Sequence, residues 1–326
     1  MNAFAAIVVA GTLSRLGYQM ARSPVLPAFA ADLGAPPEMI GAIVAASTVT
    51  GIFFKLPSGA LSDVLGKKPM MMLGAAFFAV PPFLYGFVGD PWSLLVLRFV
   101  HGFATAIFSP VASAYAASLA NTGRGARLGW FSSGNDIGAT AGPLIGGFVL
   151  YFTASYAATY FAVAAIGVLT LAVVLVLPDI ERRPHEGKRF AMRTAEFRQG
   201  LGEVLKTPPI FVAAGIEALM YLGYGAFLGF LPIYAKAAGL NDAEIAIVLG
   251  AQLAVATLAK PITGRLSDRA GRKPVILVGL LLCALALPLI FRSTSMTALV
   301  LMAPVLGLGV GAVTPVTKRS VLKNAA

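Results

Sequence analysis

The chain alternates long apolar runs with short polar loops along almost its whole length. A helix needs about 20 apolar residues to cross roughly 30 Å of membrane hydrocarbon, and ten runs come close to or exceed that length. The pattern predicts membrane-spanning helices near residues 4–29, 39–58, 69–88, 92–115, 129–151, 156–178, 209–234, 244–263, 275–291 and 297–317. We therefore expect an all-helical integral membrane protein.

Composition supports a membrane protein, and the placement of charge predicts its orientation. The chain is 58% hydrophobic and 12% charged, whereas a soluble domain carries about 25% charge. The net charge of +11 does not indicate a nucleic-acid partner, because the basic residues lie in alternate loops and not on one soluble face. By the positive-inside rule these loops and both termini are cytoplasmic, with the inner membrane of a bacterium as the expected location.

One polar stretch occurs twice. Residues 59–69 read G-A-L-S-D-V-L-G-K-K-P, and residues 264–274, 205 positions later, read G-R-L-S-D-R-A-G-R-K-P. The same offset matches Gly34 with Gly239 and Gly102 with Gly307, which shared apolar composition does not explain. Internal repeats are typical of secondary transporters, whose substrate site lies between the two halves.

The repeat predicts three parts of the chain. We expect an N-terminal half of six helices over residues 1–178 and a basic cytoplasmic linker over 179–207. A C-terminal half of four helices follows over 208–326. Basic and apolar residues interleave in the linker, which predicts an amphipathic helix lying on the anionic inner leaflet.

The repeated stretch resembles the loop that joins the second and third helices in each half of a major facilitator superfamily transporter. The resemblance implies a helical bundle of two pseudo-repeated halves. The family plan has two more helices, which the offset would place near residues 330–383, and the sequence ends at Ala326. We therefore expect a chain that lacks helices 11 and 12 of that plan.

In the family, the acidic residue of this stretch meets the start of a helix in the opposite half and latches one conformation. For Asp268 that partner is expected near residues 125–128, and for Asp63 it would be the missing helix 11. Val64 departs from the family pattern, which Arg269 keeps. The alternative is a loop that only sets topology. The candidate gating residues are Gly59, Asp63, Gly66, Lys67, Lys68, Gly264, Asp268, Arg269, Gly271, Arg272 and Lys273.

The segment 129–151 carries a ladder of small residues. Glycines three and four positions apart form a flat face on which another helix can pack closely, and a proline adds a bend. The spacing resembles the antiporter motif of the drug:proton exporters of the family, although ordinary small-residue packing is the alternative. The residues are Gly129, Gly138, Gly142, Pro143, Gly146 and Gly147.

Two spanning segments carry basic residues. Arg98 and His101 lie one turn apart in the segment 92–115, similar to the intramembrane arginine of the family. They are either a proton-relay or substrate-orienting pair, or a structural arginine bonded to carbonyl groups. Arg15, Tyr18 and Arg22 form a polar stripe on the segment 4–29, which indicates either an anionic substrate or pairing with Asp136 and Glu217.

A further polar face lies on the segment 209–234, where Glu217, Tyr221 and Tyr224 share one side. The repeat places Glu217 close to the depth of Arg15, so facing halves could form a midplane site. Desolvation disfavours a charged carboxylate there and a cation restores it, which suits proton exchange. Asp136 is the second candidate proton carrier. A structural salt bridge is the alternative for both residues.

Together these features predict a proton-coupled transporter that exports small amphipathic molecules by alternating access. Its expected partners are the lipid bilayer, a small-molecule substrate and protons. Two alternatives stay open: an organic-anion porter that uses Arg15 and Arg22, and a non-transporting, truncated protein. The sequence contains no metal-ligand cluster, nucleotide-binding loop or nucleophile triad, so we expect neither an enzyme nor a cofactor beyond the proton gradient.

Overall fold

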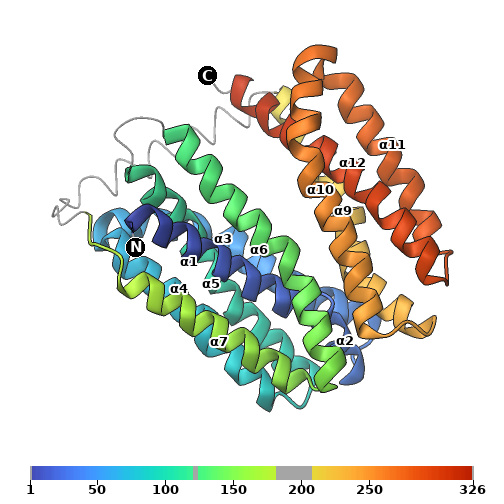
Figure 1. The fold of residues 1–326 in the computed structure, drawn as a ribbon, viewed down its shortest axis with the longest axis horizontal. Coiled ribbons are helices and arrows are strands. Elements are labelled where there is room, and N and C mark those ends of the chain that lie inside the picture. Colours follow the sequence, from blue (N-terminus) through green and yellow to red (C-terminus); the bar gives the residue numbers. More distant parts are fainter. Residues whose placement is uncertain (1, 120–123, 181–207, 325–326) are drawn as a thin grey trace. The chain divides into compact units, whose positions relative to one another are not determined.

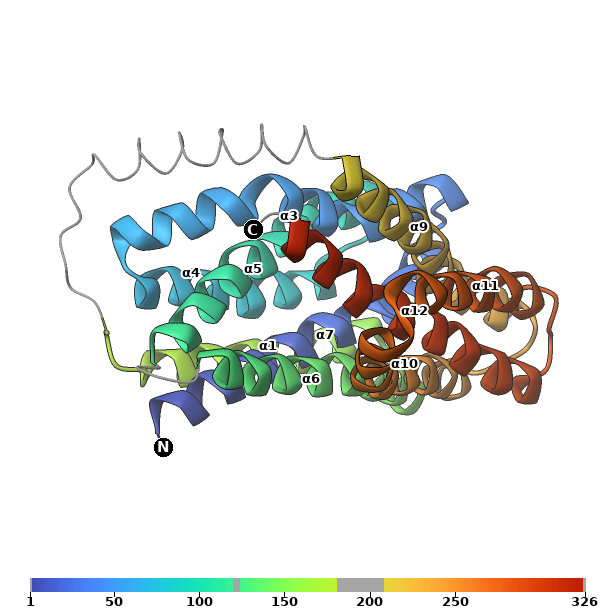
Figure 2. The ribbon, with the colours of Figure 1, turned by 90° about the horizontal axis from the view of Figure 1, so that it is seen from above.

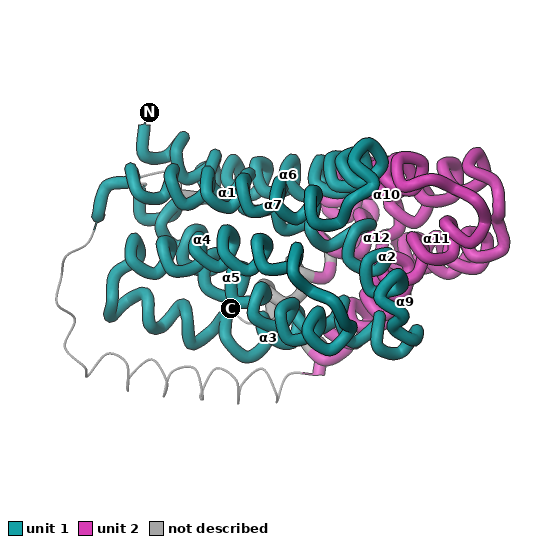
Figure 3. The backbone as a smooth tube through the Cα atoms, turned by 90° about the horizontal axis from the view of Figure 1, so that it is seen from below, with its two compact units in different colours: residues 1–190 teal, residues 191–326 magenta. Residues whose placement is uncertain are grey.

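The computed structural model describes residues 2–119, 124–180 and 208–324, and the regular elements in these ranges are all helical. The chain divides into two compact units, residues 1–190 and 191–326 (Figure 3). The predicted basic linker and its amphipathic helix fall almost wholly in residues 181–207, outside the described ranges.

The helices of each unit follow one another along the chain (Figure 1). Unit 1, residues 1–190, contains α1 (Ala3–Arg22), α2 (Val25–Asp32), α3 (Pro37–Leu65), α4 (Lys67–Leu84), the 3-10 turn η1 (Tyr85–Phe87), α5 (Pro91–Ser118), α6 (Arg124–Thr153) and α7 (Tyr156–Leu175). Unit 2, residues 191–326, contains α9 (Pro208–Ala237), α10 (Asp242–Ala270), α11 (Arg272–Ile290) and α12 (Met296–Asn324). Each of the ten predicted segments is helical, which confirms the all-helical fold.

Eight of the described helices are long and apolar enough to cross a membrane by length and composition. The predicted segments 4–29 and 129–151, which correspond to α1 with α2 and to α6, are not among them. Both carry the polar residues that the sequence marked as candidate site residues, and these lower their hydropathy. Within unit 1, α6 nevertheless packs along α1 (Figure 2).

The first predicted helix is broken, which corrects the continuous span expected over residues 4–29. α1 ends at Arg22, and Ser23 is extended with φ −148° and ψ 132° before α2 begins at Val25. A proline disfavours helical backbone at the residue before it, so Pro24 explains the break at Ser23. Pro27 is accommodated in the first turn of α2, where a backbone N–H has no intrahelical partner.

The repeated stretch is mostly helix, which corrects the polar loop predicted over residues 59–69 and 264–274. α3 runs to Leu65 and α4 begins at Lys67, so Gly66 alone separates them. Gly66 has φ 94° and ψ 149°, and its repeat partner Gly271 has φ 87° and ψ 162°. This backbone region is accessible essentially only to glycine. A single glycine, Gly66 or Gly271, therefore makes the sharp turn between consecutive helices in each copy.

The local geometry of the two halves matches at several paired positions, although the break at Ser23 has no counterpart in α9. Ser62 Oγ donates to the Gly59 carbonyl at 2.7 Å, and Ser267 Oγ donates to the Gly264 carbonyl at 2.8 Å. Gly34 and Gly239, which end the first helical region of each half, both have positive φ, 81° and 91°. The 205-residue register read from the sequence is thus reproduced in the backbone.

Helix packing repeats in the same register. α3 packs on α5 in unit 1, and α10 packs on α12 in unit 2. A Cβ added to Gly102 would lie 2.7 Å from Thr50 Oγ1, and one added to its partner Gly307 would clash with the Gln252 carbonyl. Each glycine therefore lets two helices approach closely at equivalent points.

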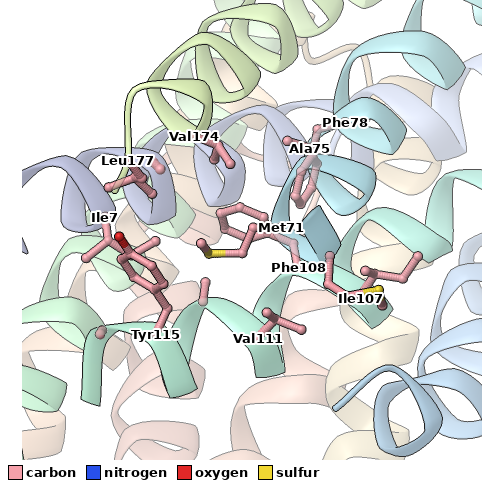
Figure 4. Close-up of a cluster of buried hydrophobic side chains, with 14 of the residues drawn as sticks. Ile7, Met71, Ala75, Phe78, Ile107, Phe108, Val111, Tyr115, Val174 and Leu177 are labelled. Atoms are coloured by element: carbon pink, nitrogen blue, oxygen red, sulfur yellow. The ribbon is translucent and has the colours of Figure 1, made fainter. Parts of the chain in front are cut away.

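The core of unit 1 lies between α1, α4, α5 and α7 (Figure 4). Its buried side chains include Ile7, Met71, Phe108 and Val174, and unit 2 has a separate core of the same kind around Phe227 and Leu249. These two large cores lie in different units, so each unit buries its own apolar side chains.

Candidate transport site

The most unusual residue in unit 1 is Arg98 of α5, whose exposed fraction is 0%. Its guanidinium carbon lies 4.8 Å from the centroid of the Tyr18 ring on α1, a cation–π arrangement. The Tyr18 hydroxyl in turn donates to Ser47 Oγ on α3 at 2.8 Å. One buried contact therefore joins α1, α3 and α5.

His101 lies beside Arg98 and is also completely buried. Its Nδ1 atom lies 3.4 Å from both Arg98 Nη1 and the Tyr85 hydroxyl, and its ring lies 5.6 Å from that of Tyr18. The structure thus brings together the two residues that the sequence paired. They contact aromatic residues, and not the carbonyl groups that the structural alternative expected.

Two further tyrosines close the cluster. The rings of Tyr85 and Tyr160 stack with centroids 4.2 Å apart and an interplanar angle of 7°. The Tyr160 hydroxyl on α7 donates to the Ala21 carbonyl of α1 at 3.2 Å. We call Arg98, His101, Tyr18, Tyr85 and Tyr160 the arginine–tyrosine cluster.

Several polar atoms around this cluster are buried without a hydrogen-bond partner. They include Arg98 Nε, Arg98 Nη2 and His101 Nε2, with Gln19 Oε1 and Ser23 Oγ nearby along the chain. Buried polar atoms are normally paired, so a group of unpaired ones needs an explanation such as a bound ligand or water.

The glycine ladder of α6 packs against α1. A Cβ added at Gly142 would lie 2.7 Å from the Leu16 carbonyl, one at Gly146 would lie 2.8 Å from the Met20 carbonyl, and one at Gly138 would clash with the Thr12 carbonyl. Pro143 lies within α6 and Gly147 is buried. Gly129 meets nothing within 4 Å, whereas Gly134, which the motif leaves out, contacts α1.

The residues of the repeated stretch lie at matching helix ends. Asp63 is half-buried and Asp268 is exposed near the ends of α3 and α10, and each makes an interaction with another group. Lys67 and Lys68 begin α4, Arg269 lies in the last turn of α10, and Arg272 and Lys273 begin α11. The expected contact between Asp268 and residues 125–128 would join the two units and stays a prediction.

The remaining candidates divide between the units. Arg15, Arg22 and Asp136 are half-buried in unit 1, and Arg15 and Arg22 act electrostatically on Tyr18. Glu217 and Tyr224 are half-buried on α9 of unit 2, whereas Tyr221 is 43% exposed. The expected closeness of Glu217 to Arg15 joins two units, so it stays a prediction.

Four residues of these contacts were not predicted from the sequence: Tyr85, Tyr160, Ser47 and Gln252. Gln252 is fully buried in unit 2, where the Tyr224 hydroxyl donates to its Oε1 at 3.3 Å. The signal for it was present, because the 205-residue register pairs Gln252 with Ser47, the acceptor for Tyr18. In the described ranges, no group of three or more His, Cys, Asp or Glu side chains could hold a metal ion.

Comparison with known sequences gives relatives along most of the chain. An uncharacterized MFS-type transporter of Methanocaldococcus jannaschii is 25% identical over 300 residues, which cover 89% of this chain and 74% of that protein. Multidrug resistance protein MdtG of Enterobacter lignolyticus is 26% identical over 287 residues, which cover 85% of this chain and 67% of that protein. Quinolone resistance protein NorA of Staphylococcus aureus is 30% identical over 156 residues, covering 47% and 39%.

Solved structures share the fold. The nucleoside transporter NupG superposes with a TM-score of 0.76 at 17% identity, covering 99% of this chain and 83% of that one. An inward-facing bacterial homologue of the human lysosomal transporter Spinster superposes with a TM-score of 0.76 at 15% identity. The match covers 98% of this chain and 74% of that one. The sequence model of the Major Facilitator Superfamily matches this chain over residues 7–218 and again over residues 213–325. This chain, with its two repeated helical halves, belongs to the Major Facilitator Superfamily, a family of membrane transporters and not of enzymes.

Proposed function

We propose that this protein is a proton-coupled secondary transporter that exports small amphipathic molecules by alternating access. Family membership supports transport, and the relatives named for multidrug and quinolone resistance support export of such molecules. The arginine–tyrosine cluster carries the proposal, because a charged residue buried in a membrane bundle is costly and usually marks a substrate or ion pathway.

The proton gradient is the proposed driving force, with Glu217 the first and Asp136 the second candidate proton carrier. Both are half-buried, Glu217 on the candidate span of α9 and Asp136 on α6, and a carboxylate in such a place can exchange its proton as its surroundings change. The close packing of α6 on α1 gives unit 1 a rigid helix pair that can move as one body during alternating access. The latch at Asp268 belongs to the same proposal.

The proposed setting is the cytoplasmic membrane of a bacterium, with both termini and the basic loops in the cytoplasm. The uneven distribution of lysine and arginine between alternate loops supports this orientation. Protons and one small solute are the proposed transported species, and no organic cofactor takes part.

An efflux assay in proteoliposomes tests the proposal. An imposed proton gradient should drive transport of a fluorescent amphipathic dye, with ethidium as the cationic probe and fluorescein as the carboxylate probe. We expect Glu217→Gln to abolish gradient-driven transport, because the neutral amide cannot release a proton. Glu244→Gln is the matched control, since Glu244 lies in an exposed capping box at the start of α10.

The outcomes separate the parts of the proposal. Equal transport by wild type and Glu217→Gln would remove Glu217 from proton coupling. Transport without a gradient dependence would remove proton coupling altogether. No transport of either dye by the wild-type chain would favour the non-transporting alternative.

A further inference from the structure

Arg98 carries a buried charge that nothing in the described part of unit 1 neutralises. Its guanidinium is always protonated, and burying such a charge in a membrane bundle is costly unless an anion pairs with it. The groups that act most strongly on it are the hydroxyls of Tyr18, Tyr85 and Tyr160. No described carboxylate forms an ion pair with it.

The unpartnered donors of Arg98 have a specific geometry. Nη1 faces His101 and the Tyr85 hydroxyl also interacts with the guanidinium, whereas Nε and Nη2 are buried without a hydrogen bond of good geometry. In the planar guanidinium, Nε–H and one Nη2–H point from the same edge as two parallel donors. This edge matches the two oxygens of a carboxylate, which arginine binds in a bidentate arrangement. A spherical ion or a single water uses that edge less completely.

The surroundings add positive charge to the same place. Arg15 and Arg22 on α1 act electrostatically on the Tyr18 hydroxyl together with Arg98. Three arginines therefore act electrostatically on one buried tyrosine of unit 1, and Arg98 contacts it directly. A cluster of this kind favours an incoming anion over a cation or a neutral molecule.

We propose that Arg98 binds the carboxylate of a small organic acid through its Nε and Nη2 edge. Tyr18 holds the guanidinium from one face, and His101 occupies Nη1 and fixes its rotation. Arg15 and Arg22 supply further attraction. The sequence left open an anion porter centred on Arg15 and Arg22, and the buried geometry instead gives the direct contact to Arg98.

The carboxylate has two sources: a transported amphipathic acid or a free small acid held as a structural ligand. The first rests on the proposed transport function, whereas the second does not. Because Arg98 is 0% exposed, the acid must enter while the helices are in another conformation. Alternating access supplies such conformations in transporters of this kind.

Thermal unfolding of the purified 326-residue chain tests the binding directly. Benzoate and benzamide share a ring and nearly one shape but differ in charge, so they form a matched pair of probes. Saturating benzoate should raise the unfolding temperature by about 5 °C, as ligand binding to the folded state does, and benzamide should not. Chloride at equal ionic strength tests whether any anion suffices.

Variants assign the effect to Arg98. Arg98→Gln should lose the benzoate shift, and Arg98→Lys should keep only part of it, because lysine lacks the planar edge. Arg127→Gln is the control and should keep it. Arg127 is a half-buried arginine of unit 1 outside this cluster: its guanidinium carbon lies 5.2 Å from the Phe4 ring centroid, and it bonds to the Leu119 carbonyl.

The proposal is wrong if benzoate gives no shift in the wild type, if benzamide or chloride gives the same shift, or if Arg98→Gln responds like the wild type. If Arg98→Gln does not fold, equilibrium binding of radiolabelled benzoate is measured instead, to the wild type and to Arg98→Lys. Equal benzoate affinity of these two proteins would refute the site. Gradient-driven export of fluorescein that benzoate blocks would show that the bound carboxylate belongs to a transported acid. Benzoate binding without any export would show that the acid is held as a structural ligand, and it would reject only the proposed transport function.

Discussion

The guanidinium of Arg98 lies over the face of the Tyr18 ring, with its central carbon 4.8 Å from the ring centroid. This contact joins α5 to α1, and the hydrogen bond from Tyr18 to Ser47 continues it to α3. In an apolar bundle these are specific interactions that hold three helices in one arrangement. The cluster is therefore expected to stabilise unit 1 as well as to serve transport.

Substitutions of Tyr18 separate the two contacts. Tyr18→Phe keeps the ring under Arg98 and loses the bond to Ser47, which should lower the free energy of unfolding by about 1 kcal/mol. Tyr18→Leu also removes the aromatic face from a desolvated arginine and should cost about 2 kcal/mol more. Thermal unfolding in detergent measures both. If the two variants unfold alike, the ring face contributes nothing to stability.

The glycine ladder predicts opposite effects for two alanine substitutions in α6. Gly138→Ala would push a methyl group into the Thr12 carbonyl of α1 and should destabilise by about 1–3 kcal/mol. Gly129→Ala has nothing within 4 Å and should stabilise by about 0.5–1 kcal/mol, because alanine is the better helix former. Thermal unfolding of the two variants gives the signs. Equal signs would mean that α6 does not pack on α1 as described.

The turn glycines predict a matched pair of effects in the two halves. Gly66→Ala and Gly271→Ala should each destabilise by about 1–3 kcal/mol, since their backbone lies where alanine is strained. Gly59→Ala, seven residues before Gly66 within α3 and with no neighbour within 4 Å, is the control and should not destabilise. Denaturation of each variant checks the pair. Tolerance of alanine at Gly66 would show that α3 and α4 join in another way.

Much of the fold followed from pattern, because membrane-spanning helices need long apolar runs and the repeat fixed their register. The 205-residue offset pairs Gly66 with Gly271, and both have positive φ. The ends of the helices were harder to predict from the sequence. Nothing between Gly59 and Leu65 breaks a helix, so α3 continues past the apolar run that marked its span.

The site was predictable only in part. The spacing of Arg98 and His101 placed them on one side of a helix, and the structure brings them together. Tyr85 and Tyr160 join them from a 3-10 turn and from α7 through packing of segments far apart in sequence. No short-range pattern encodes that packing. Their aromatic character alone did not distinguish them from other core residues.

Asp90 predicts a pH dependence outside the membrane-spanning segments. It caps α5, and its Oδ1 accepts hydrogen bonds from the backbone N–H groups of Trp92 and Ser93 at 2.9 and 3.0 Å. The Ser93 side chain also donates to Oδ2 at 2.6 Å, and this bond is the leading cause that lowers the pKa of the Asp90 carboxyl. The folded protein therefore favours the charged form of Asp90 more than the unfolded chain does.

A carboxyl whose pKa is lower in the folded state stabilises the fold at pH values above its unfolded pKa, about 3.9. That contribution is lost as pH falls from there through the folded pKa. The unfolding temperature of wild type should therefore exceed that of Asp90→Ala at pH 7, and the difference should shrink towards pH 3. Asp90→Asn can still cap α5 but does not titrate, so its difference from Asp90→Ala should not change with pH. A pH-independent difference between wild type and Asp90→Ala would show that the charge of Asp90 does not contribute to the cap.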